Sequence, residues 1–180
     1  MVATDTAGTP APSALLITGS VGAGKTTVAE IVGERLAEAW VPYAVIDLDW
    51  LRNTWPSPPD DRFNLAIELR NLRDVARNFL DAGSVRLVLA GVVETGVEQD
   101  RYRASIGLPL TLCRLRVTLP VLHTRLNGRH ELGNALRWHL ARSGELDAIL
   151  EAARLEDFSV EASELTSHEV ADAVLAGAGW

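Results

Sequence analysis

The chain has 180 residues, enough for one well-buried core and too few for two ordinary domains joined by a linker. Its charged fraction of 23% and hydrophobic fraction of 47% are typical of a folded globular protein. Seventeen basic and twenty-four acidic residues give a net charge of −7, which would repel nucleic acid and argues against a general nucleic-acid-binding protein.

Residues 1–13 precede the first apolar run and are expected to form a disordered tail. They lack the basic start and apolar middle of a signal peptide, and no apolar run approaches the roughly 20 residues that span a bilayer. The single cysteine, Cys113, cannot form an internal disulfide and lies in an apolar run, which predicts a reduced core thiol. We therefore expect a cytoplasmic protein without a membrane partner.

Short apolar runs alternate with longer amphipathic stretches along the rest of the chain. The first run, residues 14–18, ends at a glycine and is typical of a strand buried on both faces. An apolar stripe with helical period follows over 26–40 and predicts a helix. Further strands are predicted at 43–49, 85–93, 111–118 and 158–162.

The remaining helices are predicted from their periodicity and their capping residues. After a proline-rich loop, one helix is predicted from a cap at Asp60 or Asp61 to Gly83, and another over 97–106. A short helix is predicted from Pro120 to about Asn127–Gly128, followed by one or two helices within 131–155. The last helix is predicted from a capping box at Thr166 and Glu169 through Val174. Strands that alternate with helices imply an α/β fold with a parallel sheet covered on both faces. We expect residues 14–180 to form a single domain.

A glycine-rich loop, "GSVGAGKT", joins the first strand to the first helix. It has a glycine, four residues, a second glycine, lysine and then threonine, which is the spacing of a phosphate-binding loop. Its glycines let backbone amides wrap an anion, and the positive end of the helix dipole adds to the attraction. The alternative is a glycine-rich turn kept for packing alone.

The loop predicts a site for a nucleoside triphosphate. We expect Lys25 to bridge the terminal phosphates as a catalytic residue and the Thr26 hydroxyl to ligate Mg²⁺. The residues expected to contact the nucleotide here are Gly19, Ser20, Val21, Gly22, Ala23, Gly24, Lys25, Thr26 and Thr27.

Two aspartates end the second predicted strand. Strand alternation would place Asp47 and Asp49 on the same side of the chain, about 7 Å apart, at the sheet edge where ligands bind in open α/β folds. One can then hold a magnesium-bound water while the other accepts a proton from an attacking hydroxyl. The alternative is that Asp49 caps a turn over 50–53 and Asp47 is merely solvated. Arg52, one helical turn on, could bind a carboxylate or phosphate of the substrate, or pair with Asp49 at the surface.

Glu94 follows the third predicted strand, where many ATPases keep a magnesium-side acid. No aspartate closes that apolar run, which argues against an AAA-type motor, and a role for Glu94 in magnesium binding stays open.

Arginines recur in the last third of the chain. Arg125 and Arg129 would share a helix face, although we expect Asn127–Gly128 to break the helix between them. We expect both to reach the transferred phosphoryl group from a mobile segment, with Arg129 catalytic. For Arg137 and Arg142 we favour a solvated helix face, with Glu131 and Glu145 as partners. The four histidines lack a metal-ligand spacing, which argues against a zinc site.

The segments "GSVGAGKTT", "DLDWLR" and "RLNGR", and more loosely "VEASELTSHEVADAVL", resemble the small-molecule kinases of the P-loop class: adenylyl-sulfate kinase, shikimate and gluconate kinases, and chloramphenicol phosphotransferase. The resemblance implies a P-loop NTPase three-layer α/β/α sandwich with a five-stranded parallel sheet in the order 2-3-1-4-5. It also implies a helical lid near 125–142 and transfer of the γ-phosphoryl group of ATP with Mg²⁺. By position, Asp49 corresponds to the base for the substrate hydroxyl, Asp47 to the magnesium-side acid and Arg52 to a substrate-binding arginine.

The sequence departs from these families in two places. Leu48 replaces the glycine common between the aspartates of adenylyl-sulfate kinase, and "AGVVE" after the third strand matches neither that family nor shikimate kinase. The acceptor therefore stays open: we expect a small metabolite or antibiotic with a hydroxyl group, phosphorylated by a monomer or homodimer. The rivals are a nucleoside or nucleotide kinase, which would need Arg52, Arg70 or Arg73 to converge on a second phosphate, and an ATP-binding switch that transfers nothing.

Overall fold

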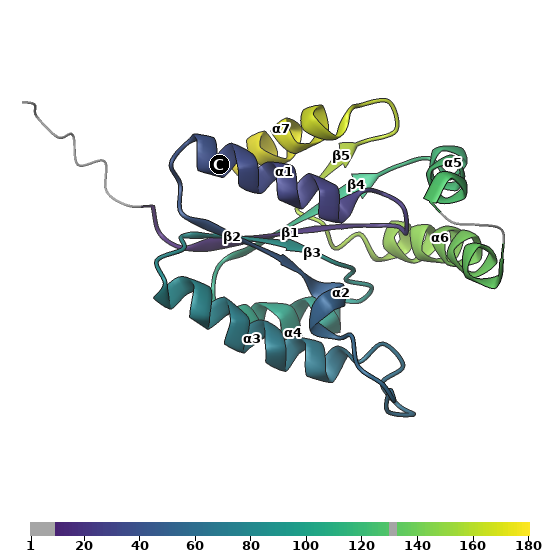
Figure 1. Cartoon of the computed structure of the whole chain (residues 1–180), viewed down its shortest axis with the longest axis horizontal. Helices are drawn as coiled ribbons and strands as arrows, with labels where there is room; N and C mark the ends of the chain where they lie inside the picture. Colours follow the sequence, from purple (N-terminus) through teal and green to yellow (C-terminus); the bar gives the residue numbers. More distant parts are fainter. Residues whose placement is uncertain (1–9, 130–132) are drawn as a thin grey trace, which may run out of the picture.

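In the computed structural model, which describes residues 10–129 and 133–180, five parallel strands form one sheet in the order β2-β3-β1-β4-β5 (Figure 1). The strands are β1 (Ser13–Gly19), β2 (Tyr43–Asp47), β3 (Arg86–Ala90), β4 (Leu110–Arg116) and β5 (Phe158–Glu161). The helices are α1 (Lys25–Glu38), α2 (Leu48–Leu51), α3 (Leu65–Asp81), α4 (Gly96–Ile106), α5 (Leu119–Arg129), α6 (Asn134–Ala153) and α7 (Ser167–Ala178). The predicted fold class and strand order are confirmed.

Helices cover both faces of the sheet. Figure 1 shows α1 and α7 on one face and α3 and α4 on the other, with α5 and α6 beyond the carboxyl ends of β1 and β4. Each face has its own apolar core, and β1 contributes to both because alternate residues of a strand point to opposite faces. Residues 14–17 of β1 are fully buried, which explains why this strand reads as a continuous apolar run.

Local caps position the helices near the carboxyl ends of the strands. The Asp61 carboxylate accepts hydrogen bonds from the backbone amides of Leu65 and Ala66, 2.8 Å each, at the start of α3. The capping box of Thr166 and Glu169 at α7 is present as predicted. By contrast, the expected helix break at Asn127–Gly128 is wrong: α5 continues to Arg129, because a single glycine costs a helix only about 1 kcal/mol.

A buried arginine fixes α6 to the sheet. Arg114 of β4 is only 2% exposed, and its guanidinium lies 3.1 Å from both Asp147 and Glu151 of α6 and 3.7 Å from Glu156. Removing one partner of a buried ion pair leaves an uncompensated charge, so this cluster holds the second half of α6 in a defined place. The first half of α6 thereby extends toward the carboxyl ends of the strands.

The remaining expectations concern the termini and the cysteine. Cys113 is fully buried in β4, and burial raises the pKa of its thiol to about 12, as expected of an unreactive core thiol. Ser13 already lies in β1, one residue inside the expected tail, while residues 1–9 lie outside the described residues. None of the helices described has both the length and the apolar character needed to cross a bilayer.

Candidate active site

The loop between β1 and α1 is open toward the edge of the sheet. Gly22 and Gly24 have φ angles of 85° and 93°, which lie in the left-handed region that favours glycine. Gly24 precedes α1 without any side-chain cap, so the first amides of the helix remain directed at the loop, where an anion would satisfy them. The Ser20 hydroxyl donates a 2.7 Å hydrogen bond to the backbone carbonyl of Ser143, so α6 fixes the loop from the other side.

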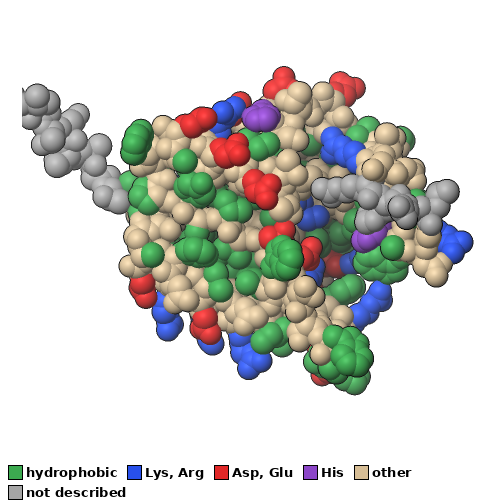
Figure 2. All heavy atoms as spheres, viewed as in Figure 1, with side chains coloured by type: hydrophobic (Ala, Val, Ile, Leu, Met, Phe, Trp, Pro, Cys, Tyr) green, Lys and Arg blue, Asp and Glu red, His purple; other side chains and the backbone are tan. Residues whose placement is uncertain are grey.

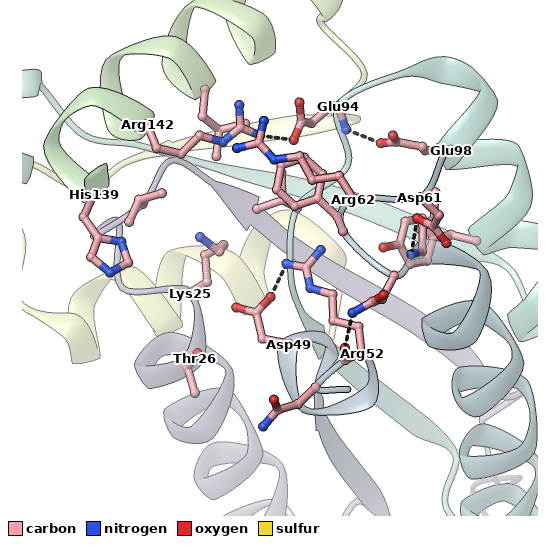
Figure 3. A pocket seen from close by; sticks show the side chains of 18 of the residues that line it. Lys25, Thr26, Asp49, Arg52, Asp61, Arg62, Glu94, Glu98, His139 and Arg142 are labelled. Atoms are coloured by element: carbon pink, nitrogen blue, oxygen red, sulfur yellow. Dashed lines mark hydrogen bonds and ion pairs between the residues drawn. The ribbon is translucent and has the colours of Figure 1, made fainter. Parts of the chain in front are cut away.

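Lys25 places its ammonium group at the loop. The Nζ atom lies 3.0 Å from the carbonyl oxygens of both Gly19 and Ser20, and the side chain points into a cavity (Figure 3). A cation held there by backbone carbonyls adds to the field of the loop amides. The predicted position of Lys25 beside a phosphate site therefore agrees with its geometry.

Thr26 and Asp47 form a pair of oxygen ligands at the same edge. The Thr26 hydroxyl donates a 2.8 Å hydrogen bond to Oδ2 of Asp47, the last residue of β2. Mg²⁺ prefers such hard oxygen groups and usually completes its shell with phosphate oxygens and water. Both residues thus fit a magnesium site beside the loop.

The second strand ends two residues earlier than predicted. β2 stops at Asp47, and Leu48–Leu51 form the short helix α2, so the argument that strand alternation aligns the two carboxylates is wrong. Asp47 is the cap of this turn, since its Oδ1 accepts a 2.9 Å hydrogen bond from the Asp49 amide. The suggested cap at Asp49 is therefore also wrong. The helical turn instead directs the Asp49 side chain into the cavity, next to Arg52 (Figure 3).

Gly91 leaves room for the Leu48 side chain at this turn. Leu48 is 1% exposed and packs directly on Gly91, just after β3. A Cβ atom at Gly91 would lie 2.9 Å from both Cβ and Cγ of Leu48 and closer still to its Cδ1. A leucine between the two aspartates is therefore accommodated by a glycine on the neighbouring strand end.

We expect Gly91→Ala to lower the free energy of unfolding by about 1–3 kcal/mol, because the new methyl group overpacks the contact with Leu48. Urea unfolding monitored by circular dichroism would measure this. The matched control is Gly144→Ala in α6, where a Cβ would meet no atom within 4 Å and the helix would gain up to about 1 kcal/mol. Equal stabilities for the two variants would contradict the proposed packing constraint.

Two cavities flank the phosphate loop. The larger, of about 1010 Å³, is lined by Lys25, Thr26, Asp49 and Arg52 together with residues 60–66, Glu94, Glu98 and the first half of α6. The smaller, of about 340 Å³, lies between the loop, Arg125 and the start of α7. Gly22, Gly24 and Thr27 line both cavities. Figure 2 shows charged side chains and a histidine gathered in a hollow near α6. The larger cavity therefore brings together the predicted Lys25, Thr26, Asp49 and Arg52.

Arg52 lies between two carboxylates. One side of its guanidinium pairs with Asp49, and Nη1 lies 3.4 Å from Oε2 of Glu68, which is fully buried in α3. Burial lowers the pKa of Arg52, but the charges of Asp49 and Glu68 outweigh this effect, so its pKa is raised. Arg52 is therefore a paired cation in the cavity wall.

Sequence reasoning missed Glu68. Its carboxylate accepts a hydrogen bond from the Tyr102 hydroxyl, and burial raises the pKa of Glu68 to about 7 while Tyr102 and Arg52 oppose the shift. Burial also raises the pKa of Tyr102. The signal was available, because Glu68 lies on the same apolar stripe as Leu65, Leu69 and Leu72, where a charged residue needs an explanation.

Arg142 is also part of the cavity wall, and the expectation of a solvated helix face is wrong. Its side chain is 10% exposed and pairs with Glu94 as well as with the expected Glu145, at 3.0 Å. Its guanidinium lies 5.3 Å from the centre of the Phe63 ring. Figure 3 shows Arg142 and Glu94 across the cavity from Asp49. Arg137 is exposed and contacts Asn134, as expected of a surface residue.

Of the two arginines expected to reach the phosphoryl group, the structure describes the side chain of Arg125. Arg125 lines the smaller cavity and donates hydrogen bonds to the carbonyls of Ala162 at 3.0 Å and Ala23 at 3.4 Å. The side chain of Arg129 and residues 130–132 of the expected lid lie outside the described residues. Arg70 and Arg73 are exposed on α3 and do not line the larger cavity as described.

Comparisons with known proteins agree with this geometry. The family model of zeta toxin matches residues 2–62, which contain the phosphate loop and the Asp47–Arg52 segment. No curated protein matches the chain significantly. A gluconokinase from Sinorhizobium meliloti 1021 is 22% identical, with a TM-score of 0.63 over 93% of this chain and 92% of its own.

Two further solved structures extend the likeness. The APS kinase of Mycobacterium tuberculosis, solved with AMPPNP and APS, is 22% identical, with a TM-score of 0.64 over 95% of this chain and 99% of its own. The tunicamycin resistance protein of Deinococcus radiodurans is 17% identical, with a TM-score of 0.65 over 93% and 96%. Over nearly its whole length the chain therefore has the fold of the P-loop small-molecule kinases, and the resemblance inferred from its sequence is confirmed.

Proposed function

We propose that this protein is an ATP-dependent kinase that transfers the γ-phosphoryl group to a hydroxyl of a small molecule. The observation that carries the proposal is the position of the phosphate loop between two cavities, of which the larger holds a carboxylate beside the loop lysine. A phosphoryl group bound at the loop would face Asp49 on one side and the nucleoside would extend on the other. This is the arrangement that a transfer between two bound ligands requires.

The lining of the cavities supports this assignment of the two ligands. None of the described residues around the smaller cavity is acidic, whereas the larger contains Asp49. A nucleobase needs an apolar pocket with a few polar groups, which Arg125, Leu165 and Val170 can supply. An acceptor hydroxyl needs a proton acceptor, so we assign the acceptor to the larger cavity.

The chemistry then follows from positioning and charge. The acceptor oxygen attacks the γ-phosphorus, its proton passes to the Asp49 carboxylate, and the bond to the β-phosphate oxygen breaks to release ADP. Lys25 and the loop amides stabilise the charge on the phosphates during the transfer. Mg²⁺, bound by Thr26 and Asp47, would neutralise further phosphate charge. We propose that Arg125 and Arg129 contact the nucleotide and that residues near 125–142 act as a lid that excludes water.

Arg70 and Arg73, which a nucleotide kinase was expected to bring to a second phosphate, are exposed and do not line the larger cavity as described, and Arg52 is already paired. Arg62, Arg101 and Arg142 do line this cavity, so a phosphorylated acceptor is tested alongside the neutral hydroxyl compounds. A nucleoside, which lacks that phosphate, remains within the proposed acceptor class.

We expect phosphoryl transfer from ATP to a low-molecular-weight acceptor in the presence of Mg²⁺. The protein would be incubated with γ-labelled ATP and either a panel of hydroxylated metabolites, aminoglycosides and amphenicols, or a filtered extract of small molecules from its source. Acceptor-dependent ADP release and label in a new small molecule would support the proposal. ATP binding by calorimetry with no label in any component of the extract would support the non-catalytic switch instead.

A further inference from the structure

A buried carboxylate lies directly behind the acceptor cavity. Glu68 is the one acidic residue among residues 10–129 and 133–180 that is buried, with 0% exposure. Its Oε1 accepts a hydrogen bond from the Tyr102 hydroxyl of α4, and its Oε2 lies 3.4 Å from Nη1 of Arg52 at the end of α2. Three helices therefore meet at this carboxylate.

Arg52 connects Glu68 to the cavity. Its Nη2 pairs with Asp49, so a single guanidinium contacts a buried carboxylate with one nitrogen and the proposed catalytic carboxylate with the other. Oε2 of Glu68 accepts no hydrogen bond among the described residues, so its contact with Nη1 is an ion pair at 3.4 Å. Because the guanidinium is planar and rigid, an attraction on one nitrogen also orients the nitrogen that pairs with Asp49. The orientation of Asp49 thereby depends on Glu68.

The backbone of this segment is held by other residues. The side-chain amide of Asn64 donates 3.1 Å hydrogen bonds to the carbonyls of Arg52 and Thr54, and that of Asn71 donates a 2.7 Å bond to the Leu51 carbonyl. Loss of Glu68 would therefore leave the chain at Arg52 in place and release only the side chain. Burial of a carboxylate is unfavourable unless the carboxylate is paired. We therefore expect Glu68 to matter mainly because it orients Arg52.

We propose that Glu68 is a positioning residue of the acceptor site, which acts through Arg52 to orient the Asp49 carboxylate toward the acceptor hydroxyl. The part played by Asp49 rests on the proposed kinase function, whereas the coupling of Glu68 to Arg52 does not. Arg52 then serves the proton acceptor and is not the anchor for an anionic group of the acceptor, which revises its expected role as a substrate-binding residue.

The charge of Glu68 gives this coupling a pH dependence. The groups that face Glu68 are Asp49 on α2, Arg52 directly after α2, and Tyr102 and Glu98 on α4. Burial raises the pKa of Glu68 from 4.5 to about 7, so the carboxylate that holds Arg52 forms only as the pH rises through this range. Activity that depends on an oriented Asp49 should rise through the same range.

Stability should change in the opposite direction. The folded protein binds the proton of Glu68 more tightly than the unfolded chain does, because the pKa of Glu68 is raised on folding. The resulting contribution to the free energy of unfolding is fully present below pH 4.5 and is lost as the pH rises through about 7. The free energy of unfolding of the wild type, measured against that of Glu68→Gln, should fall over this interval.

The kinetic test uses the full chain with Mg·ATP alone, so that water takes the place of the unidentified acceptor. We expect Glu68→Gln to lower kcat for ATP hydrolysis about 10- to 100-fold with little change in KM, and to remove the inflection near pH 7. Tyr102→Phe should keep the inflection but move it to higher pH, because the Tyr102 hydroxyl lowers the pKa of Glu68. The control, Glu30→Gln on the exposed side of α1, should match the wild type. A Glu68→Gln variant that retains the inflection would overturn the inference.

A spectroscopic test separates this inference from the kinase proposal. If the wild type turns over ATP neither with water nor with any acceptor, the proposed function fails, and the carbon-13 resonance of the Glu68 carboxyl still reports its pKa. We expect Arg52→Gln to raise that pKa, because the charge of Arg52 lowers it in the wild type. Identical titration of Glu68 in the two proteins would overturn the inference. This comparison also decides the matter should Glu68→Gln fail to fold.

Discussion

Lys25→Met is expected to reduce kcat/KM for phosphoryl transfer by about 10³-fold, which corresponds to about 4 kcal/mol of lost transition-state stabilisation. Lys25 reaches the cavity from the start of α1 with its Nζ 3.0 Å from two loop carbonyls, whereas the arginines that line the same cavity come from other segments of the chain. Steady-state ADP release would measure the loss, with thermal unfolding to show that the variant is folded.

The composition of the chain offers an independent test of this position. Lys25 is the only lysine in the sequence, so the one other amine available to an acylating reagent is the chain terminus. An ATP analogue that carries an acyl phosphate should modify Lys25, and Mg·ATP should protect it. Labelling at Lys25 that Mg·ATP does not prevent would contradict a triphosphate site at the loop.

The sequence predicts those parts of the site that are formed by residues close together in the chain. The phosphate loop needs only glycines, a lysine and a threonine at fixed spacing between a strand and a helix, and the structure has β1, the loop and α1 in that arrangement. The strand order and the capping of α7 likewise follow from patterns within short segments and from the resemblance to known kinases. These parts agree with the prediction.

The details of the acceptor cavity depend on contacts between distant residues. The packing of Leu48 at this turn depends on Gly91, a residue 43 positions later, and no pattern around "DLDWLR" reveals that contact. Arg142 looks like any charge on an amphipathic helix until the fold brings it to Glu94, 48 residues earlier in the chain. Of these residues, Glu68 alone could have been noticed in the sequence, because it is an acid on the apolar side of α3.

The difference between the local phosphate loop and the larger cavity, which distant residues assemble, explains why the reaction class is easier to predict than the acceptor. In the proposed kinase the loop and its lysine would bind the phosphates of ATP, which are the same whatever the acceptor, and this chemistry requires one fixed spacing. The acceptor cavity is assembled from α2, α3, α4 and α6, whose side chains meet only in the folded chain. Specificity therefore depends on tertiary contacts that a single sequence does not display.

The second large effect is expected at Asp49. Asp49→Asn should lower kcat by about 10²- to 10⁴-fold, the usual contribution of a general base, while the affinity for Mg·ATP stays within about twofold of the wild type. Asparagine has nearly the same shape, and the hydrogen bond that caps α2 uses the backbone amide of Asp49, so the turn is retained. Acceptor-dependent turnover and calorimetric titration of Mg·ATP would give the two quantities.

The pair of variants at Lys25 and Asp49 also separates a kinase from an ATP-binding switch. A switch needs the loop to hold ATP but has no use for a proton acceptor, so its biological activity would survive Asp49→Asn and be lost with Lys25→Met. The control is Asp74→Asn, which removes an exposed carboxylate of α3 that pairs only with Arg73 in the described structure and should leave turnover unchanged. If Asp49→Asn retains the turnover of Asp74→Asn, then Asp49 is not the base and the larger cavity is not the acceptor site as proposed.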